Sequence, residues 1–393
     1  MVQFVRNTPS DRGLPCLQHA EPALRIRVDY RYDASRELPG DSQGGPTMPK
    51  SSSKRGLVLV TGGSGYVAGY CIAELLNNGW RVRSTVRSSA KVKAVHASIS
   101  NIGSNASEIE FVEADLNSDA GWSQATGGAQ YVLHVASPVP VTDPKNDDEL
   151  VRPARDGTLR VLKAARDAAV KRVVMTSSIS AIIFGRGVRE QPFTEEDWTD
   201  ETNRGDTSPY DRAKTIAERA AWAWLASEGG GLELVAVNPG LVLGPVLGAD
   251  YSASIEFVKK LLDGSIPALP RFGFNVVDVR DVARLHVLAM TTPEAAGQRF
   301  VGSGDFYWMS DVAKILKQGL GDQARKVPFI PVPDFVARMA ALFDPIVRGR
   351  LYELGKRRPV SSEKAKRALG WTPGPITETV LDTARSLQAS GLV

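Results

Sequence analysis

The chain has 393 residues, of which 42% are hydrophobic and 23% charged, and its formal net charge is +4. This composition predicts a folded protein of about two domains. The net charge is small for the length and no long basic tract is present, so we expect no nucleic acid partner. No apolar run is long enough to span a membrane, and two cysteines cannot build a disulfide framework. These features favour a cytoplasmic protein with no membrane partner.

Residues 1–49 differ from the rest of the chain. They carry scattered prolines and many charges without a sustained hydrophobic period, which predicts a disordered extension. A partner-binding arm is the alternative. Because the leader MPKSSSKRG runs straight into the first predicted strand, we also expect the native protein to start at Met48. Upstream peptides in the mass spectrum of the native protein would contradict this start.

The stretch 57–78 joins an apolar strand to an amphipathic helix through a glycine-rich turn. Residues 57–60 are aliphatic, as in a strand buried in a parallel sheet, and apolar residues share one face of the helix that follows. Between them, Gly62 permits a tight turn, and Gly65 lets backbone N–H groups approach a pyrophosphate at the helix N-terminus. An ordinary strand-to-helix turn is the alternative. The strand before and the helix after favour a dinucleotide site, for which we expect Thr61, Gly62, Gly65, Tyr66 and Val67.

The end of the second predicted strand, 80–87, bears on the choice of cofactor. In such folds an acidic residue here binds the adenosine ribose of NAD, whereas an arginine accommodates the extra phosphate of NADP. This chain has Arg87, followed by Lys91 and Lys93, with no acidic residue close in sequence. A solvated basic loop is the alternative. We expect NADPH to be preferred over NADH, with Arg87 at the phosphate.

Two further strand ends are expected at the cofactor. After the third predicted strand, 109–113, the pair Asp115 and Leu116 falls where such folds touch the adenine. The fourth, 131–135, leads into Ala136 and Ser137, which we expect under the nicotinamide. His134 belongs to that strand and is interpreted as a core residue, because no partner with metal-ligand spacing accompanies it. No metal site is expected.

A tyrosine and a lysine four residues apart provide the candidate chemistry. Tyr210 and Lys214 lie in a helical stretch, where this spacing places both side chains on one face. A tyrosine hydroxyl has an ordinary pKa of about 10, and a neighbouring cation together with an oxidised nicotinamide lowers it. Tyr210 then becomes a usable general acid, and a serine from TSSIS, after the fifth predicted strand at 172–175, can bind the substrate oxygen.

Five sequence motifs resemble those of the extended short-chain dehydrogenase/reductases: TGGSGYVA, the Asp115-Leu116 pair, TSSIS, the YDRAK box and NPGLVLGP. Within that family the chain is similar to the branch of plant dihydroflavonol and cinnamoyl-CoA reductases and yeast methylglyoxal and aldehyde reductases. The resemblance implies that Tyr210 is the acid/base and that Lys214 orients the ribose. It also implies that Ser178 binds the carbonyl, with Ser177 and Ser180 as alternatives, and that the cofactor is also contacted by Pro239 and Gly240.

Departures from the family narrow the substrate. Where sugar epimerases read Ser-Ser-x-x-Val-Tyr-Gly, this chain reads Ser-Ser-Ile-Ser-Ala-Ile-Ile-Phe-Gly, and the acidic residues that sugar dehydratases place after the serine are missing. Plant flavonoid reductases tend to carry an asparagine where this chain has Ile183. An apolar aldehyde or ketone is therefore expected, with Ile183 and Phe184 lining the pocket. Plain core packing of both residues is the alternative.

The resemblance also implies the architecture, an α/β Rossmann fold with a doubly wound parallel sheet and a smaller C-terminal substrate-binding lobe. We assign 50–240 and 274–292 to the NADP-binding Rossmann domain, and 241–273 and 293–393 to the substrate-binding lobe. Residues 274–278 are expected at an edge of the Rossmann sheet.

These observations predict an NADPH-dependent reductase that converts aldehydes or ketones, as small-molecule carbonyl substrates, to alcohols. A 3β-hydroxysteroid or sterol-type dehydrogenase working in the oxidative direction is the alternative within the fold. A non-catalytic regulator that senses NADP is the alternative of another class, although it has little use for the serine, Tyr210 and Lys214 together.

Overall fold

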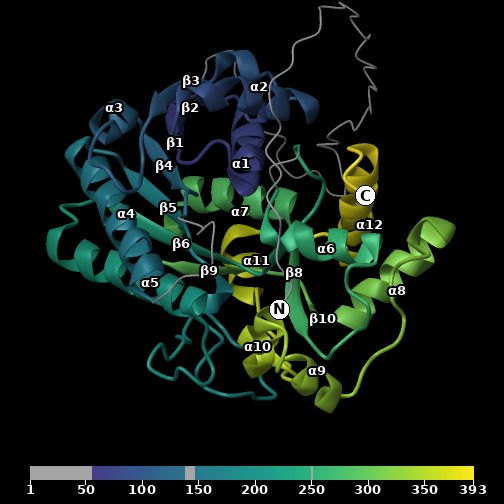
Figure 1. Ribbon diagram of the computed structural model, residues 1–393. Helices are drawn as coiled ribbons and strands as arrows, with labels where there is room; N and C mark the ends of the chain where they lie inside the picture. Colours follow the sequence, from purple (N-terminus) through teal and green to yellow (C-terminus); the bar gives the residue numbers. More distant parts are fainter. Residues whose placement is uncertain (1–54, 138–146, 249–250) are drawn as a thin grey trace, which may run out of the picture. The chain divides into compact units, whose positions relative to one another are not determined.

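The computed structural model describes residues 55–137, 147–248 and 251–393 (Figure 1). The predicted extension at 1–49 and the predicted start at Met48 lie outside these ranges.

A parallel sheet forms the centre of the described part. Its seven strands follow the order β3-β2-β1-β4-β5-β6-β9, and every neighbouring pair is parallel. The order reverses between β1 and β4, as in doubly wound folds. The predicted α/β Rossmann architecture is therefore confirmed. The strands are β1 (Leu57–Val60), β2 (Arg81–Val86), β3 (Glu110–Glu113), β4 (Tyr131–His134), β5 (Arg172–Thr176), β6 (Glu233–Pro239) and β9 (Arg299–Gly302).

Helices cover both faces of this sheet (Figure 1). Helices are needed on both faces because successive residues of β1 point to opposite sides of the sheet. Val58 and Val60 belong to one apolar core and Leu59 belongs to the other. The first core includes residues of α1 and α7, and the second includes residues of α3, α4 and α5. These helices are α1 (Tyr66–Asn77), α3 (Trp122–Thr126), α4 (Asp148–Asp167), α5 (Pro209–Glu228) and α7 (Val279–Thr291), while α2 (Val92–Asn101) follows β2.

The expected edge strand at 274–278 does not belong to the main sheet. It forms β8 (Gly273–Asp278), the middle of a smaller sheet in which β7 (Leu241–Leu243) is parallel to it and β10 (Phe306–Trp308) is antiparallel. The place beside β6 is taken by β9, from the stretch that the sequence assigned to the substrate-binding lobe. The edge prediction was wrong because hydrophobic patterning identifies a strand but not its partner.

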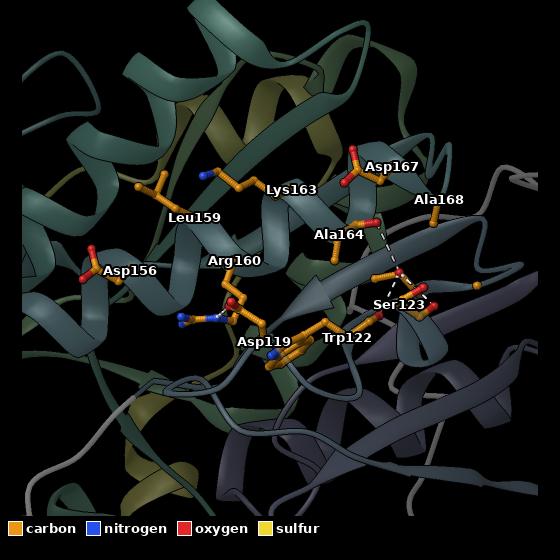
Figure 2. Close-up of a pocket in the computed structure, with 12 residues that line it drawn as sticks. Asp119, Trp122, Ser123, Asp156, Leu159, Arg160, Lys163, Ala164, Asp167 and Ala168 are labelled. Atoms are coloured by element: carbon orange, nitrogen blue, oxygen red, sulfur yellow. Dashed lines mark hydrogen bonds and ion pairs between the residues drawn. The ribbon is translucent and has the colours of Figure 1, made fainter.

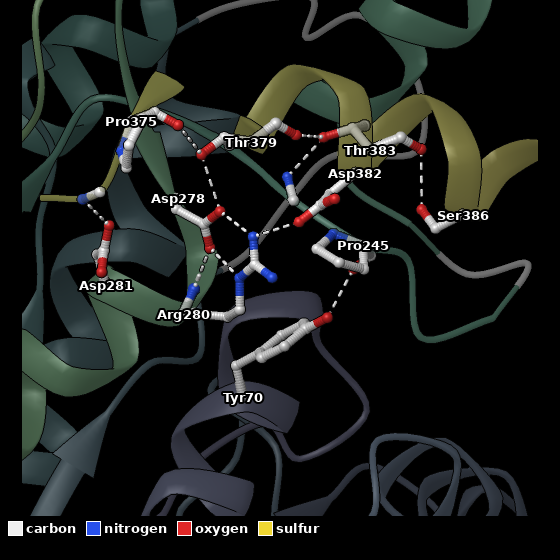
Figure 3. A network of polar contacts seen from close by, with 12 residues as sticks. Tyr70, Pro245, Asp278, Arg280, Asp281, Pro375, Thr379, Asp382, Thr383 and Ser386 are labelled. Carbon is white, nitrogen blue, oxygen red and sulfur yellow. Dashed lines mark hydrogen bonds and ion pairs between the residues drawn. The ribbon is translucent and has the colours of Figure 1, made fainter. Parts of the chain in front are cut away.

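The remaining helices come from the C-terminal third and from the loop after β7: α6 (Ala253–Asp263), α8 (Met309–Leu320), α9 (Asp334–Ala340), α10 (Pro345–Arg350), α11 (Glu363–Leu369) and α12 (Ile376–Ala389). A polar network fastens α12 to the start of α7 (Figure 3). Arg280 donates to Asp278 at 2.6 Å and to Asp382 at 2.8 Å, and Asp278 also accepts from Thr379. The last helix is thus tied to the second sheet. The boundaries assigned to the two domains stay a prediction.

Candidate active site

The glycine turn after β1 closes against the end of β4. Gly62 has φ +72°, a conformation that favours glycine, and a Cβ there would lie 3.0 Å from the Cβ of Ala136. The buried Thr61 hydroxyl lies 3.0 Å from His134 Nδ1 and accepts from the Ala136 N–H at 3.0 Å. The Thr61 side chain therefore fixes the two strand ends relative to each other. Any contact that it makes with a cofactor is left to its backbone.

The N-terminus of α1 fits a pyrophosphate. Its N-cap is Gly65, which is exposed and provides no side-chain cap, and the first turn carries no acidic side chain. The first N–H groups of a helix have no partner within the helix, so those of α1 are left to bind an anion. Val67 is half-buried. The Tyr66 side chain points into the protein, where its buried hydroxyl has no hydrogen-bond partner among the described residues. Tyr66 can therefore meet a cofactor only through its backbone.

Arg87 stands exposed at the end of β2. Its guanidinium makes neither a hydrogen bond nor an ion pair with any described residue, whereas Arg81 and Arg83 on the same strand both bind Glu110 at 2.9 Å. One acidic residue near this loop could not be found from residues close in sequence. It is Glu113 at the end of β3, whose carboxylate accepts a hydrogen bond from the Ser89 N–H. The loop after β2 thus carries the Arg87 guanidinium, which has no partner among the described residues. The backbone of the same loop binds the Glu113 carboxylate.

Asp115 and Leu116 shape the loop after β3. Asp115 Oδ1 accepts from the Asn117 N–H at 2.8 Å, and the Asp115 carbonyl accepts from Trp122 Nε1 at 3.0 Å. Leu116 packs against Gly157 of α4, because a Cβ added to Gly157 would lie 2.9 Å from the Leu116 Cβ. Both residues are half-buried. Their predicted contact with the adenine stays a prediction.

The carboxyl ends of the central strands meet at one edge of the sheet, where ligands bind in folds of this kind. Ala136 and Ser137 follow β4 and are half-buried. Pro239 ends β6, and Gly240 lies so close to β8 that a Cβ would come within 2.3 Å of the Asn275 carbonyl. The predicted nicotinamide residues therefore lie at the ends of β4 and β6, the strands on either side of β5.

Hydrogen bonds distinguish the three serines after β5. Ser177 is buried and donates to Glu218 Oε2 at 2.5 Å, and Ser180 is buried and bonded to Asp211. Ser178 is half-buried, caps the turn that follows through the Ser180 N–H at 3.1 Å, and lies close enough to the Tyr210 hydroxyl to lower its pKa. This arrangement favours Ser178 as the serine that meets a substrate.

Tyr210 and Lys214 lie at the start of α5. Ser208 and Asp211 form a capping box there, and Pro209 occupies the first helical position, so the helix begins at a defined residue. Tyr210 is 46% exposed, and the Lys214 ammonium lies 6.0 Å from the centre of its ring. Lys214 Nζ also donates to the Thr176 carbonyl at 3.4 Å, which holds the lysine against the end of β5.

The predicted pKa shift of Tyr210 is not produced by the protein groups alone. Desolvation of the hydroxyl, aided by the charge of Asp211, raises the pKa of Tyr210 to about 12. Among the described residues, Ser178 and Arg350 act in the opposite direction, rather than Lys214. Burial lowers the pKa of Lys214 to about 8, against the raising effect of Glu218. Ser178 and Arg350 therefore favour the phenolate, and the lowering expected from Lys214 together with an oxidised nicotinamide stays a prediction.

A buried carboxylate below these residues was missed by sequence reasoning. Glu218 is 0% exposed and accepts from Ser177, from Asn238 Nδ2 at 2.8 Å and from Arg299 Nε at 2.6 Å. Asn238 Nδ2 also donates to the Ser178 carbonyl at 3.0 Å. The helical spacing could have identified it, because Glu218 lies four residues after Lys214, as Lys214 lies four residues after Tyr210. All three therefore share one face of α5. This network fixes the serine loop to α5.

The C-terminal part reaches the same helix through Tyr352. Its hydroxyl donates to Asp211 Oδ2 at 2.8 Å. Its ring packs edge-on against that of Phe184, with the two ring centres 5.6 Å apart. Tyr352 thus touches both the start of α5 and the loop after Ser178. No local pattern in the sequence pointed to it.

Ile183 and Phe184 do not face open space. They are 5% and 6% exposed and belong to an apolar core with Ile182 and Phe193. This burial favours the core-packing alternative over the predicted pocket lining.

A hollow of about 730 Å³ lies elsewhere, between α3 and α4 (Figure 2). Its lining includes Asp119, Trp122, Arg160 and Lys163, and Arg160 is ion-paired with Asp119. Among the described residues, those predicted for the site take no part in this lining. The hollow is therefore separate from the candidate active site.

The buried His134 is expected to make the fold less stable in acid. Burial, with a smaller contribution from Lys214, lowers its pKa to about 3. Below the ordinary histidine pKa of about 6.5 the unfolded chain binds a proton that the folded protein does not. The free energy of unfolding therefore decreases as the pH is lowered. We expect His134→Asn to reduce the slope of unfolding free energy against pH by up to about 1.4 kcal/mol per unit, the full difference falling between about pH 4 and 5.5.

Urea unfolding at constant ionic strength measures this slope. His286 is the matched second variant, because burial lowers its pKa to about 4. His286→Asn is expected to change the slope to a similar degree. Unfolding curves of His134→Asn that track the parent at every pH would contradict the buried neutral state of His134.

Comparison with known proteins supports the same family. The model of the NAD dependent epimerase/dehydratase family matches residues 58–301. Tetraketide alpha-pyrone reductase 2 of Arabidopsis thaliana is 35% identical over 264 residues, which cover 66% of this chain and 81% of that protein. Cinnamoyl-CoA reductase 1 of Petunia hybrida is 32% identical over 337 residues, which cover 85% and 93%.

Solved structures agree with this assignment. Yeast methylglyoxal/isovaleraldehyde reductase Gre2, complexed with NADPH, is 25% identical with a TM-score of 0.69, and the match covers 86% of this chain and 100% of that one. Vestitone reductase from alfalfa, at 24% identity and a TM-score of 0.68, shares the fold over 86% of this chain and 100% of its own. The resemblance inferred from the motifs is confirmed. With the doubly wound sheet, the glycine turn and these relatives together, the chain belongs to the NAD-dependent epimerase/dehydratase family of extended short-chain dehydrogenase/reductases, in the dihydroflavonol-reductase-like branch.

Proposed function

We propose that the protein is an NADPH-dependent reductase that converts aldehydes or ketones to alcohols. The observation that carries the proposal is the meeting of Ser178 and Tyr210. They come from separate elements, the loop after β5 and the start of α5, and are close enough beside the carboxyl edge of the sheet for Ser178 to lower the pKa of the Tyr210 hydroxyl. Lys214 follows one helical turn later. A binding protein without turnover has no need of this proton donor and this oxygen ligand side by side.

The cofactor is proposed to bind along the strand ends. The N–H groups at the start of α1 hold the pyrophosphate, and Arg87 binds the adenosine phosphate that distinguishes NADPH from NADH. Bound NADPH supplies a hydride for transfer to a carbonyl carbon. The yeast reductase Gre2, whose structure was solved with NADPH, supports this choice of cofactor.

Three side chains perform the remaining chemistry in this proposal. Tyr210 donates its hydroxyl proton to the carbonyl oxygen as negative charge develops there. Ser178 donates a hydrogen bond to the same oxygen and orients it towards Tyr210. Lys214, held by the Thr176 carbonyl, places its cation beside the tyrosine and towards the cofactor edge of the sheet. The carbonyl oxygen is thus met by two hydroxyl groups fixed to rigid elements.

Arg87→Ser tests the cofactor preference. Loss of the charged hydrogen bonds to a phosphate is expected to lower kcat/KM for NADPH by about 10- to 100-fold. The value for NADH is expected to change little, because NADH lacks that phosphate. Steady-state kinetics with both cofactors measures the ratio. Arg81→Ser is the matched control, because Arg81 lies on the same strand but is paired with Glu110. Equal losses with both cofactors would contradict the role of Arg87.

The proposed function is tested by following NADPH oxidation at 340 nm. The panel contains aliphatic and aromatic aldehydes, diketones and flavonoid ketones, with a hydroxysteroid and NADP run in reverse. Reduction of aldehydes or ketones with a preference for NADPH is expected. Oxidation of the hydroxysteroid alone would contradict the proposal in favour of a sterol-type dehydrogenase. Tight NADPH binding with no turnover of the whole panel would favour a sensor.

A further inference from the structure

Large apolar side chains are exposed together in one short stretch. In the described part of the chain ten large hydrophobic residues are exposed, and seven of them lie between 329 and 343. Phe343 is 84% exposed, and within α9 the one buried residue is Ala337. We call these seven residues the apolar patch: Phe329, Ile330, Phe335, Val336, Met339, Leu342 and Phe343. Exposed apolar patches on folded proteins mark sites of interaction with proteins or membranes.

The patch is held in place by the rest of the protein. Residues before α9 pair with Leu269, whose N–H donates to the Ile330 carbonyl at 3.1 Å. Asp334, the first residue of α9, accepts from Arg271 at 2.8 Å. After α9, Arg348 of α10 donates to the Ala341 and Leu342 carbonyls at 2.8 and 3.0 Å. Figure 1 shows α9 and α10 next to each other. The apolar side chains therefore lie on α9 and on the residues that flank it, and this segment is anchored at both ends.

Positive charge surrounds the patch. The stretch 325–350 contains five basic residues and two acidic ones. Two of these charges are paired with residues outside the stretch, Asp334 with Arg271 and Arg350 with Glu353. All five basic residues are exposed: Arg325, Lys326, Arg338, Arg348 and Arg350. Apolar side chains that insert between lipids, flanked by cations that attract anionic headgroups, are the features of interfacial membrane helices. The same cations disfavour a second copy of this face, because like charges would then oppose each other.

We propose that the apolar patch and its basic rim dock onto the surface of a membrane that contains anionic lipids. Within the described residues, no helix is both long and apolar enough to cross a membrane. The proposal concerns binding to the membrane surface, and in this it revises the expectation of no membrane partner.

The position of the patch connects the membrane to the candidate active site. From α10 the chain continues through Arg350, whose charge acts on Tyr210, to Tyr352, whose hydroxyl binds Asp211 beside Tyr210. A carbonyl compound dissolved in the bilayer would thus leave the lipid close to the predicted proton donor. Membrane binding itself does not depend on reduction.

Co-sedimentation of the full chain with vesicles tests the proposal. Vesicles of phosphatidylcholine alone are compared with vesicles that also contain phosphatidylserine, at low and high salt. We expect binding to the anionic vesicles that weakens as salt is added. Phe335→Ser with Phe343→Ser is expected to weaken binding at least about tenfold, and Arg338→Glu about tenfold.

Two matched controls keep the test specific. Val188→Ser removes an apolar residue that is 55% exposed outside the patch, and Lys171→Glu reverses an exposed charge on a different loop. Both are expected to bind as the parent does, and thermal unfolding verifies that every variant is folded. The proposal is overturned if the parent ignores anionic vesicles or if the controls lose binding equally. It is also overturned if light scattering shows a dimer that Phe335→Ser with Phe343→Ser dissociates, because the patch is then a subunit interface. The assay requires no turnover, so these results are independent of the proposed reduction.

Discussion

Replacing Tyr210 by phenylalanine is expected to lower kcat for carbonyl reduction by about 10²- to 10⁴-fold, while NADPH affinity is retained. The change removes a single hydroxyl, the proposed proton donor, and leaves the ring and the N-terminal turn of α5 in place. The capping box formed by Ser208 and Asp211 does not involve that hydroxyl. Steady-state kinetics gives kcat, and titration of NADPH fluorescence gives the affinity.

The control for this variant is a tyrosine outside the site. Tyr307→Phe, in β10, removes a hydroxyl from the second sheet and is expected to keep the parent kcat. If Tyr210→Phe reduced carbonyls at the parent rate, the assignment of the proton donor would be wrong. If it lost NADPH binding as well, the loss of activity would no longer identify a proton-transfer step.

Arg299→Met is expected to destabilise the fold by about 3–5 kcal/mol. Glu218 is fully buried, and the variant leaves its carboxylate without the guanidinium that lies 2.6 Å away. Ser177 and Asn238 still donate to Glu218, but neither neutralises its charge. Urea unfolding at pH 7 measures the difference in free energy.

Two comparisons separate a buried charge from a general effect of removing arginine. The double variant Glu218→Gln with Arg299→Met removes both charges and is expected to recover much of the lost stability. Arg81→Met breaks a pair that is exposed on both sides, with 51% and 42% of the two side chains accessible, and is expected to cost less than about 1 kcal/mol. A cost for Arg299→Met no larger than that of Arg81→Met would contradict the account of the Glu218 network.

Local patterns in the sequence predicted the framework of the site. The strand, turn and helix at 57–78 could be predicted because hydrophobic period and glycine position are properties of neighbouring residues. The step of four residues between Tyr210 and Lys214 could be predicted for the same reason.

The contacts that distinguish one serine from another could not be predicted in this way. The partners of Glu218 lie 41, 20 and 81 residues away in sequence, and Tyr352 is 141 residues from Asp211. The partner of strand β8 was also mistaken, because a strand's pattern does not identify its neighbour. The pKa of Tyr210 depends on burial and on Arg350, which enters the site from the C-terminal part.

Transfer of deuterium from NADPH labelled at C4 of the nicotinamide tests the central claim most directly. The protein is incubated with each face-labelled form of the cofactor and an aldehyde or ketone that it turns over, and the alcohol is analysed by mass spectrometry. We expect one deuterium on the former carbonyl carbon from one of the two labelled forms, and about 10²- to 10⁴-fold less labelled alcohol in the same time from Tyr210→Phe. Alcohol formed without deuterium from either form would contradict hydride transfer from NADPH.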